Sequence, residues 1–441
     1  MSDVLNIPII ARGKVIMPGD DAILYKGRVG ADFRQANPHK HIHDLVLGDA
    51  SRLRDLHDTP IAEIIDVLAE LGKRLVLNDN PLLQEIFELA LQAGGLAEPI
   101  LRGVYDALPL MFLAEGMTAL VDKTIGLNYI DSWVPSGGQF DMVSIRAIGT
   151  RQLHITAGNV PVVAAMTIAR AGLTKSDILI KSPSNDPLTA NAIARTLIEL
   201  APDHPVTKHI AVAYWKGGDE HMDSQIIRTS RIDKITAWGG MSSVRHIQKF
   251  LTPGIDLTAL NPKYSMSMVG RETFDTEAAM DECAVGLATL AGFYNQTACA
   301  NTRLVYVESD TDEDSIEKVI ELGRKMVKAY ALIPPLLSVP FVVRNRELEA
   351  EMEAVALEDD FYHVEGDTLN GGFVVSKFND RVEFFDKLNN KVVNFVPVDK
   401  LEDVIKWCDD TTQTVGLYPE SRREGLRDTF ALAGIQRLVS L

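Results

Sequence analysis

Cysteine is scarce in this sequence, with only Cys283, Cys299 and Cys408 among 441 residues. These residues form no C-x-x-C pair, which excludes the common zinc and dithiol redox motifs, and they are too few for a disulfide framework. Because thiols stay reduced in the cytosol, we expect a cytoplasmic protein. Each thiol can then be structural or catalytic, and its neighbours in the sequence must decide which.

Positive charge and long apolar runs are also lacking. The 44 lysines and arginines stand against 61 aspartates and glutamates, which gives a net charge of −17. Nucleic acid binding needs a basic face that neutralises phosphates, so nucleic acid is not expected as the main partner. No run of about 20 apolar residues exists, so we expect no membrane span. The start of the chain has no basic stretch before an apolar core, and we expect no signal peptide.

Alternating strand and helix signals dominate the middle of the chain. A parallel sheet covered by helices is predicted where apolar strands alternate with helical patterns about 25–30 residues apart. Four such strands are expected at residues 152–157, 177–182, 209–215 and 233–238. A second α/β region is expected after Pro262, with strands at 264–269, 303–307, 372–378 and 391–398 and helices at 275–293 and 315–332.

The flanking segments have weaker patterns. Residues 6–25 mix apolar pairs with glycine and proline and predict short strands and turns, with two helices following. Helical signals fade between residues 129 and 150, where Pro135 and Gly137 separate two strand-like stretches, so we expect a projecting hairpin there. A helix near 420–433 and a strand at 435–441 are expected at the end of the chain.

The first candidate for chemistry is a cysteine in a loop. Residues 295–301 read Asn-Gln-Thr-Ala-Cys-Ala-Asn, a polar stretch of small residues between an apolar helix and a strand. Cys299 in such a loop would be accessible to a substrate, and its thiolate would be a strong nucleophile. Cys283 and Cys408 lie within expected helices, so a buried structural role explains them better.

Polar and small residues also follow the strands at the sheet edge where parallel sheets bind ligands. Asn159 lies between a strand and its helix, where it could cap the helix or donate a hydrogen bond to a developing oxyanion. Lys181 and Ser184 follow the second strand of the series. Gly239 and Gly240 follow the fourth, before a helix whose N-terminus favours anions. These residues could hold a dinucleotide, although the usual G-x-G-x-x-G is absent.

Taken in order, these motifs resemble the aldehyde dehydrogenase superfamily. More closely, the chain is similar to the acyl-CoA reductases typified by the fatty-acid reductase of bacterial bioluminescence. The resemblance runs from about residue 6 to the end of the chain. It rests on the stretches 158–161, 179–187, 237–240, 296–299, 412–416 and 433–438.

The resemblance implies an aldehyde-dehydrogenase-like α/β fold. A Rossmann-type, parallel-sheet nucleotide-binding domain would comprise residues 1–128 and 151–262. Residues 263–434 would form a second α/β domain, the catalytic one, whose C-terminal part could return to the first domain. A small β element for oligomerisation would comprise 129–150 and 435–441.

The resemblance also implies the roles of the site residues. Cys299 would be the nucleophile that accepts the acyl group, and Asn159 would be the oxyanion donor together with the Cys299 backbone N–H. Around the dinucleotide would lie Lys181, Ser184, Gly239 and Gly240. The implied partners are NADPH, an acyl thioester of CoA or of a protein, an acyl-transferring enzyme and further copies of the chain.

Two departures from the family pattern bear on direction and cofactor. Aldehyde-oxidising relatives carry a glutamate before Leu-Gly-Gly-Lys in the strand that opens the catalytic domain, whereas residues 264–270 contain no acid. A base there would activate water against the cysteinyl thioester, so its absence favours reduction, unless Glu272 reaches the site. NAD-selective members often have an acid where Ser184 stands. Its absence favours NADPH, because an acid would repel a 2′-phosphate, although Asp186 is near.

Alternative functions remain open at this point. An aldehyde-oxidising NAD(P)-dependent dehydrogenase is one. A thiol acyltransferase or hydrolase that uses Cys299 without a nucleotide is another, and a non-catalytic nucleotide-binding module is a third. His39, His41 and His43 could bind zinc if they alternated on a strand beside Asp44, but no fourth distant ligand is evident, and we expect no metal.

Overall fold

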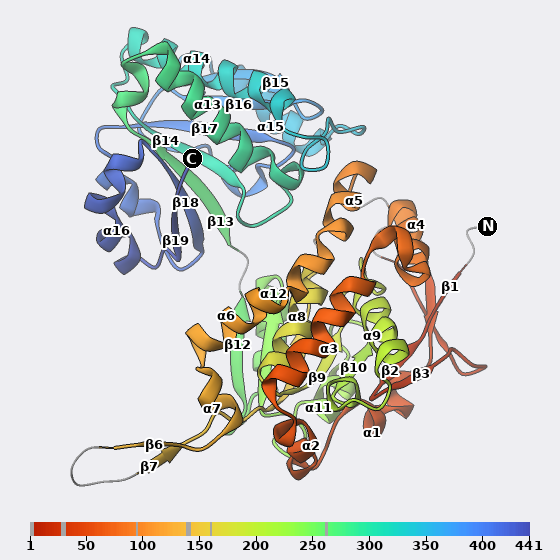
Figure 1. Ribbon diagram of the computed structural model, residues 1–441. Coiled ribbons are helices and arrows are strands. Elements are labelled where there is room, and N and C mark those ends of the chain that lie inside the picture. Colours follow the sequence, from red (N-terminus) through yellow and green to blue (C-terminus); the bar gives the residue numbers. More distant parts are fainter. Residues whose placement is uncertain (1–3, 28–31, 94–95, 138–142, 159–160, 261–262) are drawn as a thin grey trace. The chain divides into compact units, whose positions relative to one another are not determined.

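The computed structural model describes residues 4–27, 32–93, 96–137, 143–158, 161–260 and 263–441. The chain divides into two compact units, Met1–Asn261 and Pro262–Leu441, each built of helices and a central sheet (Figure 1).

A seven-stranded sheet in the order β12-β11-β8-β9-β10-β2-β3 forms the centre of the first unit, among its described residues. The first five strands in this order are parallel to one another. Four of them are the predicted strands, and β12 is an additional strand at the edge of the sheet. Their bounds are β8 (Arg151–Ile155), β9 (Asp177–Lys181), β10 (Ile210–Ala213), β11 (Lys234–Trp238) and β12 (Asp256–Leu260), and the antiparallel pair is β2 (Ile9–Ala11) and β3 (Lys14–Ile16).

Helices cover both faces of this sheet, as the apolar strands predict. Along β9, Ile178 and Ile180 belong to one buried cluster and Leu179 to the other. The first cluster packs under α3 (Ile61–Arg74), α4 (Pro81–Ala93), α5 (Glu98–Asp106), α6 (Ala114–Thr124), α8 (Val162–Leu173) and α9 (Thr189–Leu200). The second packs under α1 (Ile42–Leu45), α11 (Glu220–Ile226) and α12 (Met241–Gln248).

Smaller elements complete the first unit. The predicted hairpin is present: β6 (Val134–Ser136) pairs antiparallel with β7 (Val143–Ile145), and Figure 1 shows the pair extending from the body of the unit. Residues 138–142, which follow β6 and precede β7 in the sequence, lie outside the described part. The other short elements are β1 (Leu5–Ile7), β4 (Ile23–Tyr25), β5 (Phe33–Gln35), α2 (Arg54–Asp58), α7 (Leu127–Asp131) and α10 (Pro205–Lys208).

The second unit has its own seven-stranded sheet, in the order β15-β16-β17-β14-β13-β18-β19. All neighbours are parallel except β15 and β16. The strands are β13 (Tyr264–Val269), β14 (Thr302–Glu308), β15 (Tyr362–Asp367), β16 (Gly371–Ser376), β17 (Val392–Val398), β18 (Thr412–Tyr418) and β19 (Arg437–Ser440). The helices are α13 (Glu277–Gly292) and α14 (Glu313–Ala329) over one buried cluster, and α15 (Arg346–Ala356) and α16 (Arg423–Leu432) over the other.

Candidate functional site

The carboxyl ends of β11, β8, β9 and β10 are neighbours in the first sheet, so the turns that follow them meet along one edge. Gly158 after β8 packs tightly against the loop after β9, since a Cβ at this position would lie 2.7 Å from Pro183. The Asn185 side-chain amide donates a hydrogen bond to the Gly158 carbonyl at 2.9 Å. The predicted oxyanion donor, Asn159, is the next residue and lies outside the described part.

Lys181, at the end of β9, lies at this edge over the ring of Trp215. Its Nζ is 4.8 Å from the centroid of the Trp215 ring, and its side chain is mostly buried. Burial lowers the pKa of Lys181, while the nearby Asp223 and Asp219 carboxylates oppose that shift. Trp215 Nε1 in turn donates to Asp223 at 2.8 Å. No hydrogen bond from Lys181 Nζ is formed within the described residues, so the ammonium group is available to a ligand.

Asp186, in the loop after β9, is held in place by hydrogen bonds. Its Oδ1 accepts hydrogen bonds from the Thr189 N–H (3.0 Å) and hydroxyl (2.9 Å), so the carboxyl group caps α9. Burial raises the pKa of Asp186, against the effect of these bonds. Ser184 is half-buried. Ser182 Oγ is buried without a hydrogen-bond partner among the described residues, which leaves one polar atom for a ligand.

Gly239 and Gly240 follow β11 at the same edge. Gly240 is the N-cap of α12 with an ordinary φ of −63°, so its backbone does not require glycine. A Cβ on Gly240 would meet nothing within 4 Å, and one on Gly239 would lie 3.4 Å from Ser243. The chain's own packing therefore leaves open space above this turn, as close approach of a diphosphate would require.

Cys299 is the exposed thiol of the second unit, in the loop between α13 and β14. Its carbonyl accepts a hydrogen bond from Ser265 Oγ of β13 at 2.8 Å. The buried Asn301 side chain accepts from the Ala298 N–H at 2.9 Å and donates to the Phe293 carbonyl at 2.8 Å. The loop is thus fixed from both sides while the thiol stays accessible. No hydrogen bond from the Cys299 backbone N–H is formed within the described residues.

The segment before this loop has an unusual backbone. Tyr294, Asn295 and Gln296 have φ values of 48°, 51° and 62°, although none is glycine. A left-handed conformation costs about 1–2 kcal/mol for each such residue, and it persists only where the surroundings enforce it. Asn295 Oδ1 accepts from the Ser338 hydroxyl (3.1 Å), and Gln296 Nε2 donates to the Thr302 carbonyl (2.8 Å). This enforced turn determines where the cysteine loop begins.

The other two thiols differ from Cys299. Burial raises the pKa of Cys283 to about 12. Burial, with the Asp409 charge, raises the pKa of Cys408 to about 12. Neither thiol is ionised near neutral pH, and neither side chain is exposed. Cys299 is therefore the exposed thiol among the three cysteines, and its role as the nucleophile stays a prediction.

Glu272, the one acid that the sequence left as a candidate base, lies at the far end of β13. Ser265 near the start of β13 contacts the Cys299 carbonyl, whereas Glu272 follows the last residue of the strand, Val269. The strand from Ser265 to Val269 alone spans about 13 Å. Burial acts to raise the pKa of Glu272, but the hydrogen bond from Arg422 Nε (2.7 Å), a backbone hydrogen bond and the charges of Arg422 and Arg271 together lower it. Within this unit, Glu272 is not a base for chemistry at Cys299.

Three residues that hold the cysteine loop were missed from the sequence, namely Ser265, Asn301 and Arg303, whose Nη2 donates to the Gln296 carbonyl at 3.4 Å. Ser265 is a fully buried hydroxyl in an apolar strand, and a polar residue in such a place is the signal that could have indicated a loop contact. Asn301 and Arg303 follow Cys299 closely, but many loops contain such residues. Their roles depend on contacts that only the fold reveals.

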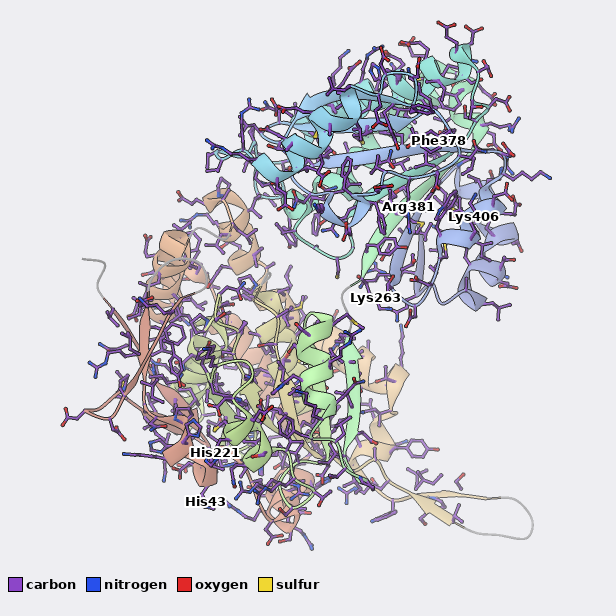
Figure 2. The ribbon with its side chains drawn as sticks, turned by 180° about the vertical axis from the view of Figure 1, so that it is seen from behind. His43, His221, Lys263, Phe378, Arg381 and Lys406 are labelled. Carbon is purple, nitrogen blue, oxygen red and sulfur yellow. The ribbon has the colours of Figure 1, made fainter. Side chains whose placement is uncertain are left out.

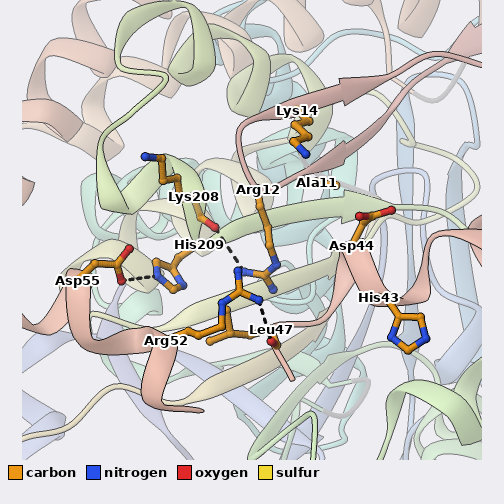
Figure 3. A pocket seen from close by; sticks show the side chains of 10 residues that line it. All are labelled: Ala11, Arg12, Lys14, His43, Asp44, Leu47, Arg52, Asp55, Lys208 and His209. Carbon is orange, nitrogen blue, oxygen red and sulfur yellow. Dashed lines mark hydrogen bonds and ion pairs between the residues drawn. The ribbon is translucent and has the colours of Figure 1, made fainter. Parts of the chain in front are cut away.

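A separate pocket of about 330 Å³ opens at the opposite edge of the first sheet, beside the amino ends of β9 and β10 (Figure 3). His209 in its wall bridges Asp55 (2.8 Å) and Asp177 (3.0 Å), and Arg12 pairs with the same Asp177. Because β9 runs from Asp177 to Lys181, this pocket is a strand's length from the predicted dinucleotide edge. It is not the predicted cofactor site.

The histidine-rich segment does not form the zinc site considered above. His39 lies in a short 3-10 helix and His43 in α1, so the residues do not alternate on a strand. His39 pairs with Asp219 at 3.0 Å and His41 with Asp44 at 3.1 Å, and His43 lies at the surface (Figure 2). Within the described ranges, no group of three or more His, Cys, Asp or Glu side chains could hold a metal ion.

The helices of the described residues were compared with the length and hydropathy that a membrane span needs. No single helix there is both long enough and apolar enough to cross a bilayer, and one bent pair, Glu98–Phe112 with Ala114–Thr124, meets the criteria by length and composition only.

Sequence relatives share long stretches with this chain. The long-chain acyl-protein thioester reductase of Aliivibrio fischeri is 31% identical over 323 residues, covering 73% of this chain and 64% of the relative. The enzyme of the same name from Photorhabdus luminescens is 31% identical over 330 residues, covering 74% and 64%. The chain thus matches slightly less than two thirds of the length of these curated relatives.

Solved structures show the fold. An aldehyde dehydrogenase from Physcomitrella patens, in complex with succinate, superposes with a TM-score of 0.73 at 13% identity, covering 99% of this chain and 90% of that one. The NADP-dependent glyceraldehyde-3-phosphate dehydrogenase from Bacillus halodurans, complexed with NADP, gives 0.69 at 15% identity, with coverages of 99% and 90%. The predicted fold class, aldehyde-dehydrogenase-like α/β, is confirmed.

The family comparison agrees with the motifs from which the resemblance was first inferred. The model of the family described as acyl-CoA reductase (LuxC) matches residues 56–441, which include Lys181, Gly239, Gly240 and Cys299. The chain belongs to the acyl-CoA reductase (LuxC) family.

Proposed function

We propose that this chain reduces a long-chain acyl thioester to an aldehyde with NADPH, by way of a thioester on Cys299. The observation that carries the proposal is the cysteine loop, which presents an exposed thiol beside a backbone N–H that has no hydrogen-bond partner within the described residues, while Ser265 and Asn301 hold the loop in place. Family membership and the names of the relatives, long-chain acyl-protein thioester reductases, support the same chemistry.

In the proposed first half-reaction, the Cys299 thiolate attacks the acyl carbonyl. The tetrahedral oxyanion accepts hydrogen bonds from the Asn159 amide and the Cys299 N–H, and the donor thiol, from CoA or a protein, leaves. The acyl group then stays on Sγ as a thioester. The covalent step divides one difficult transfer into two easier ones.

In the second half-reaction, Lys181, Ser184, Gly239 and Gly240 would hold NADPH, which would supply a hydride to the thioester carbonyl. The same two donors hold the second oxyanion, and its collapse releases the aldehyde and restores the Cys299 thiolate. Overall, an acyl thioester, NADPH and one proton give an aldehyde, NADP and a free thiol. No acid lies on β13, and Glu272 follows its far end, which supports reduction over hydrolysis of the intermediate.

The edge of the first sheet fits a dinucleotide. Lys181 Nζ and Ser182 Oγ have no hydrogen-bond partner within the described residues, and the space above Gly240 is open. We assign the cofactor to Lys181, Ser184, Gly239 and Gly240. Two features support NADPH over NADH: Ser184 carries no charge that would repel a 2′-phosphate, and the Asp186 carboxyl group is engaged in capping α9.

Assembly and protein partners form a further part of the proposal. The hairpin segment 129–150 exposes Trp133, Val143 and Ile145, and β19 is the last strand of its sheet. Such exposed apolar side chains and a terminal strand suit pairing with further copies of the chain. We also propose an acyl-transferring enzyme as the source of protein-bound acyl groups.

The function is tested with acyl-CoA esters of graded chain length and an acylated carrier protein, with NADPH and NADH compared as reductants. We expect NADPH consumption matched by aldehyde, with long chains preferred. Thioester hydrolysis without nucleotide would indicate a thiol hydrolase instead. Acid formation from aldehyde and NADP, without the reductive reaction, would indicate an oxidising dehydrogenase. NADPH binding without turnover of any thioester would leave only a binding module.

Replacing Ser184 by glutamate should weaken NADPH binding by about 10–100-fold and leave NADH binding within about twofold, because the new carboxylate would lie near the 2′-phosphate. Fluorescence titration of each nucleotide gives both dissociation constants. Ser184→Gln, which matches the glutamate in size without its charge, should bind NADPH nearly as the wild type does. Unchanged NADPH affinity in the glutamate variant would remove Ser184 from the phosphate site.

A further inference from the structure

Behind the predicted dinucleotide edge of the first sheet lies a buried carboxylate that the mechanism above does not use. Asp223, in α11, is fully buried. Its Oδ1 accepts a hydrogen bond from Trp215 Nε1 at 2.8 Å, and its Oδ2 accepts one from His246 Nε2 at 2.8 Å. Because a buried carboxylate is costly unless its oxygens have donors, these two bonds tie the three side chains to one arrangement.

The two donors belong to different elements of the predicted dinucleotide edge. Trp215 follows β10, and its ring centroid lies 4.8 Å from the Nζ of Lys181, the last residue of β9. His246 lies in α12, the helix whose N-cap is Gly240. Asp223 therefore connects the lysine at the end of one strand with the helix that follows the glycine turn of another.

The Lys181 ammonium group depends on the Trp215 ring for its position. Its Nζ donates no hydrogen bond in the part of the chain that the structure describes, and a cation over an indole face is attracted by the charge distribution of the ring. The Trp215 side chain is fully buried, and its Nε1 is satisfied by Asp223. The bond to the carboxylate thus selects the orientation in which the indole meets the lysine.

The helix that carries Asp223 is itself fixed at its first turn. Asp219 is the N-cap of α11, and its Oδ1 accepts a hydrogen bond from the Met222 N–H at 3.0 Å. Its Oδ2 accepts a bond of 3.0 Å from His39 Nε2. The Asp223 N–H donates to the Asp219 carbonyl at 2.9 Å, so the carboxylate begins from a rigid backbone.

We infer that Asp223 is a positioning residue for the cofactor: through Trp215 it orients the Lys181 ammonium group, and through His246 it holds α12. The inference rests on the proposed function, in which Lys181 and the glycine turn before α12 hold NADPH. Asp223 is buried and does not itself reach the nucleotide. Loss of its contacts should therefore weaken NADPH binding and leave the reaction of the bound nucleotide unchanged.

The test is the dissociation constant of NADPH, measured by fluorescence titration of the full chain. His246→Ala removes one donor to Asp223 and should raise the constant about tenfold, the scale of losing one hydrogen bond to a charged group. His246→Gln keeps an N–H that can reach the same oxygen and should restore most of the affinity. Trp215→Phe keeps a ring beside Lys181 without the Nε1 donor and should weaken binding by a similar factor.

Kinetics with an acyl thioester give a second readout. In His246→Ala the KM for NADPH should rise, while kcat at saturating NADPH stays within about twofold of the wild type, because the binding of the nucleotide and not its reaction is affected. A kcat that falls as far as the affinity would contradict a role confined to positioning the cofactor.

His209→Ala is the matched control, because His209 also bonds to carboxylates, Asp55 and Asp177, but at the opposite edge of the same sheet. It should lower the melting temperature and leave NADPH affinity unchanged. If His246→Ala also lowers the melting temperature but binds NADPH as the wild type does, its role is purely structural and the inference is overturned. Equal losses of affinity in both alanine variants would overturn it as well. A wild type that binds no NADPH would instead refute the proposed function, and the inference with it.

Discussion

Cys299→Ser should abolish the acyl-enzyme and lower thioester reduction by at least about 10³-fold, while NADPH binds as it does to the wild type. A serine hydroxyl is far less acidic than a thiol, so it attacks the acyl carbonyl much more slowly. Mass spectrometry of the chain after mixing with an acyl-CoA gives the covalent yield, and nucleotide fluorescence gives cofactor affinity.

Cys408→Ala is the matched control for this experiment. Cys408 is half-buried, its pKa is raised to about 12, and its Sγ donates to the Val404 carbonyl at 3.4 Å. The alanine variant should therefore acylate and reduce normally. An acyl group still bound to the Cys299→Ser protein would mean that another residue is the acceptor, and the proposed mechanism would fail with it.

The sheet and its ligand edge could be predicted because they depend on local patterns. Strands apolar on both faces, such as 177–181, identify a covered parallel sheet, and the following residues then meet at one edge whatever the strand order. Lys181, Gly239 and Gly240 were placed at this edge in this way, and the structure has them there. The terminal β-structure was harder. The strand β18, which contains Gly416, was not predicted. The packing explains the glycine, because a Cβ at this position would lie 2.6 Å from the Leu290 side chain.

The surroundings of the thiol could not be predicted, for a different reason. Tyr294, Asn295 and Gln296 adopt left-handed backbone without the glycine that usually signals it, because tertiary hydrogen bonds enforce the turn. The position of Glu272 depends on strand direction: three residues beyond Val269 place it at the wrong end of β13.

Asn159→Ala should lower kcat by about 10²–10³-fold, equivalent to about 3–4 kcal/mol of transition-state stabilisation, with little change in NADPH affinity. The side-chain amide would donate to both tetrahedral oxyanions, so acylation and reduction should slow together in single-turnover experiments. The Cys299 N–H would remain as the second donor, which explains why activity should fall without vanishing.

A second variant separates the amide's chemistry from the shape of its turn. Asn185→Ala removes the hydrogen bond to the Gly158 carbonyl, one residue before Asn159, and leaves the proposed donor in place. If catalysis depends on the Asn159 amide, this variant should lose much less activity than Asn159→Ala. If the turn's shape alone matters, the two losses should be similar and NADPH affinity should fall with them, since Asn185 belongs to the loop that carries Ser184. Full activity in Asn159→Ala would leave the Cys299 N–H as the proposed oxyanion donor, and the role proposed for Asn159 would be wrong.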